Sequence, residues 1–142
     1  MAMINPYLSF SGNCEEAFNF YKSVFGGEFL RLVRFKEVPS EQSVPASEGE
    51  KIMHVALPIG KAVLMASDAS STCGPQLAPG NNFSISINAE SEEEATRLFN
   101  GLSAGGHVIM PLHKAFWNAY FGMFTDKFGI QWMVNYEYGP HT

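Results

Sequence analysis

The chain has 142 residues, of which 46% are hydrophobic and 16% charged, and its formal net charge is −5 at pH 7. This composition is typical of a soluble globular domain and excludes an extensively disordered chain. The basic residues form no cluster, so nucleic-acid binding is not expected. No apolar run approaches the roughly 20 residues that span a bilayer, so no membrane partner is expected either.

The N-terminus and the cysteines indicate the compartment. Residues 1–8 contain no basic stretch followed by an apolar one, so no signal peptide is predicted and the cytoplasm is expected. The two cysteines, Cys14 and Cys73, belong to no CxxC pair and no Cys/His cluster. Free thiols are therefore predicted in this reducing compartment.

The first half of the chain predicts a strand, a helix and three more strands. Residues 5–10 alternate in polarity, as a short strand does. The helix is predicted to begin at Asn13, a candidate N-cap, with Glu15 in its first turn, and to end at Gly26. A polar loop and three strands should follow, the loop over residues 37–50 and the strands over 28–36, 51–59 and 62–67.

The second half repeats this pattern after a loop over residues 68–81. Residues 82–88 alternate most clearly in the chain and predict a strand. Ser91 followed by Glu94 forms the capping-box pattern of a helix start, and Gly105 should end that helix. The last three strands are predicted over residues 107–112, 116–124 and 130–136.

The order β-α-β-β-β therefore occurs twice, which indicates an internal duplication. Three segment pairs support the match: Asn5–Phe10 with Asn82–Ile87, Glu15–Ala17 with Glu93–Ala95, and Val63–Met65 with Gln131–Met133. Each half is too small to bury a sheet face alone. The sequence predicts one α+β domain over residues 1–142, in which module 1 (about 1–70) and module 2 (about 81–138) form a curved mixed sheet around a cleft.

Several motifs, spread over nearly the whole chain, support a family resemblance. They are Pro6–Leu8, Gly12–Ala17, Phe20–Tyr21, Phe25–Gly27, Ile52–Val55, Leu64–Met65, Trp117–Gly122 and Thr125–Trp132. With these segments the chain closely resembles the PhnB-like branch of the vicinal oxygen chelate superfamily of glyoxalases, bleomycin resistance proteins and dioxygenases. The resemblance implies the glyoxalase/bleomycin resistance fold and a homodimer. It does not identify the reaction, because one fold hosts many activities.

Members of this superfamily often hold a divalent metal with ligands from the first and last strands of each half. The resemblance places these positions at Asn5 (or its neighbour Pro6), Val63, Asn82 and Gln131. None is His, Asp, Glu or Cys, and Asn and Gln offer only neutral carbonyl oxygens that suit Ca²⁺ as auxiliary ligands. We therefore expect no cofactor and no tightly bound catalytic metal, while a weakly held divalent ion stays open.

His54 is the first candidate for chemistry. It lies among the apolar residues Met53 and Val55 in a predicted strand. It is either a general base lining the cleft or a half-buried histidine bonded to a neighbour. Ser67 and Asp68 are either polar contacts at the mouth of the cleft or a strand end that caps its own turn.

Trp117, Tyr120 and Phe121 form an aromatic cluster. On a strand, Trp117 and Phe121 would share one face and Tyr120 the other, so one set could line a pocket for a flat ligand while the other packs in the core. Cys14 stands at a helix start, where a thiolate is favoured, but no His or Asp spacing supports a nucleophile. His107 and His113 would lie roughly 20 Å apart along a strand and are expected on the surface.

Two functions from different classes agree with these residues. The first is an enzyme-like protein whose cleft binds a small organic molecule oriented by His54, Asn82 and Gln131. The alternative is a protein that sequesters an apolar or aromatic compound without turnover, and a third hypothesis is a catalytically empty paralogue. The cleft residues predicted for either ligand are Asn5, Tyr7, Val63, Asn82, Trp117, Tyr120, Phe121 and Gln131.

Overall fold

The computed structural model describes residues 2–37, 49–69 and 77–138. The chain divides into two compact units, Met1–Pro79 and Gly80–Thr142, which we call module 1 and module 2. Their boundary falls inside the predicted loop over residues 68–81. Within the described ranges, no helix is both long enough and apolar enough to cross a membrane.

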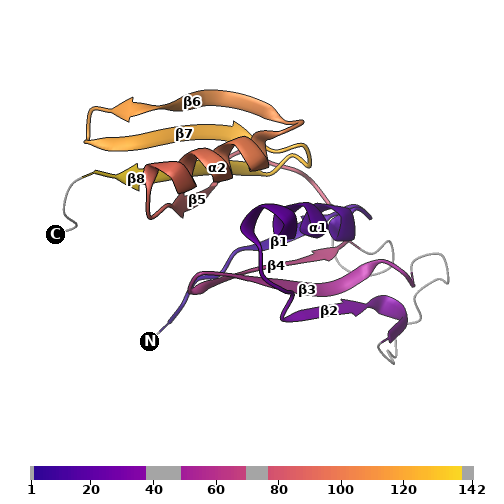
Figure 1. Ribbon diagram of the computed structural model, residues 1–142. Helices are drawn as coiled ribbons and strands as arrows, with labels where there is room; N and C mark the ends of the chain where they lie inside the picture. The colour runs from indigo at the N-terminus through magenta and orange to yellow at the C-terminus, as the bar shows by residue number, and fades with distance from the viewer. Residues whose placement is uncertain (1, 38–48, 70–76, 139–142) are drawn as a thin grey trace. The chain divides into compact units, whose positions relative to one another are not determined.

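Among its described residues, module 1 contains one α-helix and four strands (Figure 1). Its elements are β1 (Tyr7–Phe10), α1 (Cys14–Phe25), β2 (Arg31–Arg34), a 3-10 turn η1 (Phe35–Glu37), β3 (Ile52–Ile59) and β4 (Ala62–Asp68). The strands form sheet A in the order β1-β4-β3-β2. β1 runs parallel to β4, and the other two pairs are antiparallel.

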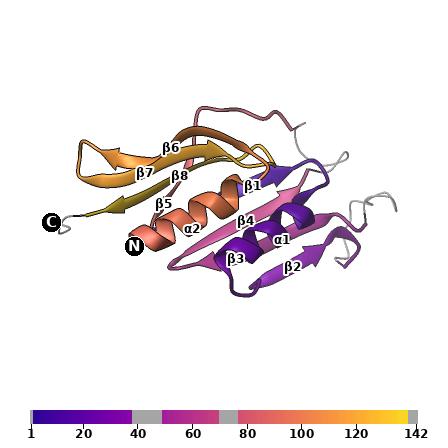
Figure 2. The ribbon, with the colours of Figure 1, turned by 45° about the horizontal axis from the view of Figure 1, so that its top comes forward.

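Module 2 repeats this topology (Figure 2). Its elements are β5 (Ile85–Asn88), α2 (Glu92–Ser103), β6 (His107–Ala115), β7 (Ala119–Thr125) and β8 (Gln131–Glu137). The strands form sheet B in the order β5-β8-β7-β6, again with one parallel pair, β5 and β8. The predicted α+β fold class with two β-α-β-β-β modules is confirmed, and hydrogen bonding groups the strands into one mixed four-stranded sheet per module.

Each helix packs on one face of its own sheet, which we call the helix face, and the opposite face is called the open face. Side chains alternate between the two faces along every strand. In module 1 the helix face supplies the buried apolar side chains Leu8, Phe10, Val55, Leu57, Leu64 and Ala66. In module 2 the ring of Phe99 on α2 lies 5.1 Å from that of Phe124, centroid to centroid. The core of each module therefore lies between its helix and its sheet.

The two helices begin differently. Ser91 accepts a hydrogen bond from the backbone N–H of Glu94 at 3.0 Å, so the predicted cap of α2 is confirmed. Asn13 is the N-cap residue of α1, as predicted, but its side chain makes no capping hydrogen bond. A carboxylate from β4, that of Asp68, accepts from the Cys14 N–H at 3.0 Å instead. An acceptor this far away in sequence could not be predicted from a local cap pattern.

Several predicted strand boundaries change in the structure. The predicted strand over residues 116–124 is wrong at its start, because residues 116–118 form a turn in which Asn118 has φ 61°. The aromatic residues at positions 116 and 117 favour a strand in a prediction from sequence. In the structure, Ala115 on β6 is paired with Ala119 on β7, so the three residues between them must reverse the chain. The predicted strands over residues 5–10, 28–36 and 82–88 are shorter than expected, and β4 extends to Asp68.

The strand pairing fixes which positions of the two modules are equivalent. The burial patterns along residues 63–67 of β4 and 131–135 of β8 agree with the predicted match of Val63–Met65 with Gln131–Met133, which makes Ala66 the counterpart of Val134. Ala66 pairs with Leu8, and Val134 pairs with Ile87. Leu8 therefore corresponds to Ile87.

If Val63–Met65 matches Gln131–Met133, the strand pairing shifts the predicted match of Asn5–Phe10 with Asn82–Ile87 by two residues, and the position equivalent to Asn5 becomes Ser84. A shift of two residues keeps every side chain on its face. The polarity pattern of the sequence alone could not detect it.

Candidate functional site

The open face of sheet A carries the polar candidates of module 1. Tyr7 on β1 is 51% exposed, and its hydroxyl lies 3.5 Å from Nδ1 of the half-buried His54 on β3. The two ring centroids are 5.9 Å apart. This O···N distance is long for a hydrogen bond, so the contact is weak and contributes mainly to the orientation of the imidazole ring. The structure thus brings together two of the predicted site residues.

This pair can make hydrogen bonds with a ligand. A phenol hydroxyl both donates and accepts, and a neutral imidazole has one nitrogen of each kind. With Nδ1 directed at Tyr7, Nε2 of His54 is the nitrogen left for another group. Both predicted alternatives for His54 agree with this placement, since it is half-buried beside a neighbour and faces away from the helix.

Module 2 has different residues at the equivalent positions. Val55 pairs with Ala66, and Gly122 pairs with Val134, so His54 corresponds to Phe121. The open face of sheet B combines apolar and polar side chains around this position. Its central side chains are Met110, Met123 and Met133 in one cross-strand row and His113, Phe121, Asn135 and Asn88 in the next.

The structure separates the predicted aromatic cluster. The rings of Trp117 and Phe121 meet with centroids 5.4 Å apart, and Trp117 is 48% exposed. Tyr120 pairs with Tyr136, and both lie on the helix face of sheet B, opposite to Phe121. The two sets predicted from strand alternation therefore exist, with Trp117 joining its set from the turn before β7.

Three of the four predicted metal positions contact the backbone through their amides or have no ligating side-chain atom. Asn5 Oδ1 accepts a hydrogen bond from the Val63 N–H at 3.1 Å. Gln131 donates from Nε2 to the carbonyl oxygen of Phe83 at 2.8 Å. Both amides thus support the edges of parallel strand pairs, the side chain of Val63 cannot ligate, and Asn82 is exposed ahead of β5. In the part of the chain that the structure describes, no three His, Cys, Asp or Glu side chains gather at metal-binding distance. This donor set does not fit a transition metal.

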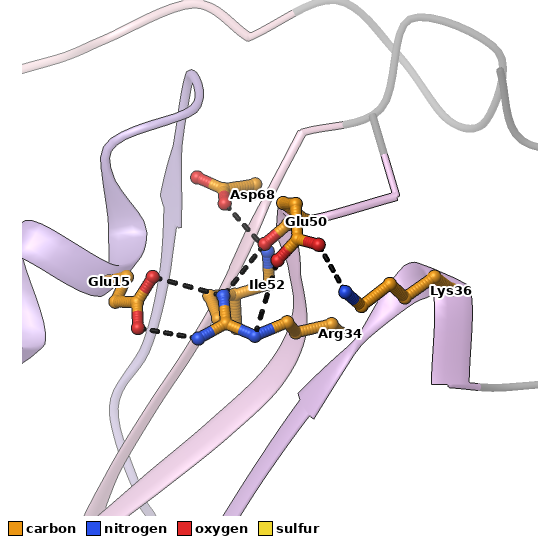
Figure 3. Close-up of polar contacts among 6 residues, drawn as sticks. All are labelled: Glu15, Arg34, Lys36, Glu50, Ile52 and Asp68. Atoms are coloured by element: carbon orange, nitrogen blue, oxygen red, sulfur yellow. Dashed lines mark hydrogen bonds and ion pairs between the residues drawn. The ribbon is translucent and has the colours of Figure 1, made fainter. Parts of the chain in front are cut away.

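Asp68 has a structural position at the end of β4 (Figure 3). Its buried carboxylate accepts from the backbone N–H groups of Gly12 at 2.9 Å, Cys14 at 3.0 Å and Ile52 at 2.8 Å. These contacts join the start of α1, the start of β3 and the end of β4. Of the two alternatives for this residue, the structure supports a strand-end cap, whereas its neighbour Ser67 lies on the open face.

An ion-pair cluster lies beside Asp68 at the same end of module 1 (Figure 3). Arg34 on β2 makes a bidentate pair with Glu15 on α1, with N···O distances of 2.9 and 2.6 Å. This hydrogen-bonded pairing lowers the pKa of the Glu15 carboxyl. Arg34 also donates to the backbone carbonyl of Glu50 at 2.8 Å, and the Glu50 side chain pairs with Lys36. These side chains hold β2 against α1 and β3.

Cys14 is not placed as a nucleophile. The thiol is fully buried, and burial, with the nearby Asp68 and Glu15 carboxylates, raises its pKa strongly. The thiolate is therefore unfavourable despite the helix N-terminus. Cys14 is a free cysteine, and Cys73 lies outside the described residues.

The remaining histidines have no cluster around them in the described ranges. His107 and His113 are exposed at the two ends of β6, as predicted. The ring Nδ1 of His113 donates to the carbonyl oxygen of Pro111 at 2.9 Å.

The sequence analysis missed Asn135 and the methionine row. Asn135 Oδ1 is buried and accepts no hydrogen bond. An amide within the largely apolar run of β8 was the available signal. The three methionines stand on separate strands, so their alignment in one row depends on strand register, which the sequence does not give.

With this geometry in view, comparison with known proteins identifies the family. The sequence model of the glyoxalase/bleomycin resistance protein/dioxygenase superfamily matches residues 3–134. The chain belongs to this superfamily. One curated superfamily relative, Protein YjdN of Escherichia coli (strain K12), is 34% identical over 140 residues that cover 93% of each chain.

Solved structures support the same superfamily. Protein PA1353 from Pseudomonas aeruginosa is 46% identical, with a TM-score of 0.84 over 96% of this chain and 98% of that one. A PhnB protein from Bacillus cereus is 28% identical, with a TM-score of 0.73 over 95% of this chain and 99% of that one. The resemblance to the PhnB-like branch is therefore confirmed.

Proposed function

We propose that this protein binds a small organic molecule on the open face of sheet A, with His54 and Tyr7 as its polar contacts. The observation that carries the proposal is the contact of these two side chains at 3.5 Å on the sheet face that α1 does not cover. A histidine and a tyrosine there can hydrogen-bond a ligand carbonyl or hydroxyl group. His54 is the residue proposed as general acid or base if the ligand is turned over.

We also propose that the protein works without a tightly bound transition metal. The chemistry of the donors supports this, because Asn5 and Gln131 use their amides on backbone groups and Val63 has no ligating atom. Any ion held there would be weak and oxygen-bound. The proposal distinguishes this chain from metal-dependent members of its superfamily.

A second candidate is sequestration of an apolar or aromatic compound without turnover. The open face of sheet B favours it, because Phe121 and Trp117 stand where module 1 has its polar pair. The discriminating observation would be tight binding with no chemical change in the bound compound.

The superfamily resemblance also supports a cytoplasmic homodimer. Light scattering should then give one species near twice the chain mass of 15.7 kDa. A monomer at micromolar concentration would contradict the dimer without affecting the binding proposal.

The first experiment measures metal content and ligand contact on the same untagged protein. Elemental mass spectrometry should find less than stoichiometric transition metal, and a stoichiometric metal would overturn the metal-free proposal. NMR of the histidine rings would then follow titration with a fragment library of carboxylic acids, phenols and amides. We expect binding fragments to shift the His54 resonances, and His54→Gln to weaken binding by about tenfold.

The matched control is His107→Gln, which alters an exposed histidine at the start of β6 in module 2. It should leave the affinity of the same fragments unchanged. If no fragment shifts His54, or if both variants weaken binding equally, the His54–Tyr7 site is wrong.

A further inference from the structure

The open face of sheet B holds a buried hydrogen-bond acceptor without a donor. Asn135 Oδ1 has no contact with solvent and accepts no hydrogen bond. The residue lies on β8, opposite Phe121 on β7 and Asn88 on β5. Almost all buried polar atoms in folded proteins have partners, so an unsatisfied one requires a physical explanation.

The surroundings of Asn135 suit a flat, polarizable group. The Phe121 ring across the strand pair meets Trp117 edge to face, at an interplanar angle of 67°. The neighbouring row consists of Met110, Met123 and Met133. Aromatic rings and thioethers both contact aromatic ligands favourably. The orphaned oxygen therefore lies beside a surface made of aromatic and thioether side chains.

The fold itself does not require this arrangement. The positions of module 1 equivalent to Asn135 and Phe121 are Ser67 and His54. Module 1 therefore forms the same sheet without a buried amide or an aromatic pair at this place. Because the sheet does not need them, these side chains are candidates for recognition of a ligand.

We propose that the open face of sheet B binds a flat aromatic group whose edge carries an N–H or O–H donor. The ring packs against Trp117 and Phe121, and the donor bonds to Asn135 Oδ1. Access requires a local rearrangement, because Phe121 and Asn135 Oδ1 are buried, whereas Trp117 on the turn before β7 is 48% exposed. This inference rests on the second candidate function, sequestration of an aromatic compound on the open face of sheet B, and specifies a ligand class for it.

The test compares indole with 1-methylindole, which keeps the ring system but has no N–H donor. Both are titrated into the ¹⁵N-labelled full-length chain. The indole N–H signal of Trp117 reports the proposed site. That of Trp132 is an internal reference, because this buried side chain donates to Asp126 at 2.8 Å. We expect both ligands to shift Trp117, with indole binding about three- to tenfold more tightly, as one added hydrogen bond allows.

Two variants then locate the bond. Asn135→Leu removes the acceptor at similar volume and should bring the two affinities to within about twofold. Asn88→Leu alters the exposed neighbouring amide and should keep the preference for indole. The proposal is overturned if the wild type binds indole and 1-methylindole with equal affinity, or if Asn135→Leu still prefers indole. It is also overturned if the ligands shift other NMR signals but not that of Trp117.

The wild-type comparison holds even if Asn135→Leu fails to fold. Failure here is also distinguishable from failure of the proposed function. If the His54 ring responds to fragments while indole shows no preference, only the donor-bearing aromatic class is wrong. If indole is preferred while His54 never responds, the binding site belongs to module 2 alone.

Discussion

The two modules share their topology but not the chemistry of their open faces. Each has a β-α-β-β-β order and a sheet with one parallel pair. The helix faces agree in kind, since both are buried and apolar. On the open face, however, module 1 has Tyr7 and His54, whereas module 2 has a methionine row and the pair Trp117–Phe121.

This difference shows which residues a duplicated fold leaves free to change. The helix face must bury apolar area to stabilise each module, so its character is retained. The open face supplies fewer of the buried apolar side chains, among them Ala56, Ala119 and Phe121, so it is less constrained. It can therefore acquire hydrogen-bonding groups in one copy and aromatic groups in the other. Function in this chain is expected to depend on those differences rather than on the common fold.

The largest expected loss of stability comes from changing the buried carboxylate of module 1, Asp68, and it is compared with the same change at Asp126 of module 2. Asp68 accepts from residues 16, 54 and 56 positions away, whereas Asp126 accepts from Phe128, Ile130 and Trp132, at most 6 positions away. In Asp68→Asn, one acceptor oxygen becomes an NH₂ group that faces a donor. We expect a loss of about 3 kcal/mol in the free energy of unfolding.

Asp126→Asn makes the same chemical change around a local turn. It should cost less, about 1–2 kcal/mol, because the turn can relax without separating distant elements. Urea denaturation followed by circular dichroism measures both. Equal losses would show that the long-range contacts of Asp68 add nothing, and the proposed difference between the modules would be wrong.

The next largest loss of stability is expected from a substitution on the helix face of sheet B, at Gly122. This position corresponds to Val55 of module 1. A Cβ atom on Gly122 would lie 2.6 Å from Cε2 of Phe99 and 3.1 Å from the backbone nitrogen of Leu112. Gly122→Ala should therefore displace α2 and cost about 1–3 kcal/mol. Thermal unfolding provides the measurement. Gly80→Ala is the control, since its Cβ would meet only Asn82 Oδ1 at 3.9 Å, and it should be nearly neutral.

Gly122 also illustrates what sequence analysis could and could not predict. Element order, helix ends and the α2 cap follow from local patterns, as Ser91 with Glu94 shows. The register of β1 and β5 does not, because a shift of two residues preserves the polarity pattern. The sequence identified His54 and Tyr7 as candidates, but only strand pairing shows that they touch. Asn135 and the close approach of Phe99 to Gly122 also depend on pairing between distant segments.

A smaller effect concerns the ion pair that ties α1 to sheet A. Arg34 lowers the pKa of Glu15, so folding is stabilised at pH values above the ordinary carboxyl pKa, and this contribution is lost as the pH falls through the lowered value. Glu15→Gln should cost about 0.5–1 kcal/mol at pH 7, since the pair is partly exposed. The difference from wild type should shrink below about pH 4.

Urea denaturation at several pH values checks this dependence. Glu28→Gln is the matched control, because Glu28 pairs with Lys22 in the same module but is largely exposed. It should be nearly neutral at every pH. A cost of Glu15→Gln that stays constant down to pH 3 would contradict the assigned role of the pair.

The smallest expected change in stability comes from Cys73→Ser, and this variant asks whether the two modules unfold together. It leaves Cys14 as the only thiol of the chain, so labelling reports module 1 alone. Because Cys14 is fully buried and its pKa is raised, labelling by a disulfide reagent at pH 8 should be on the order of 10³-fold slower than that of a free thiol.

Adding Trp117→Phe makes Trp132 the only tryptophan and a fluorescent reporter of module 2. If thiol exposure and Trp132 fluorescence change at the same urea concentration, residues 1–142 unfold as one domain, as the sequence predicts. Separate midpoints would show that each module buries enough apolar area between its helix and its sheet to fold independently.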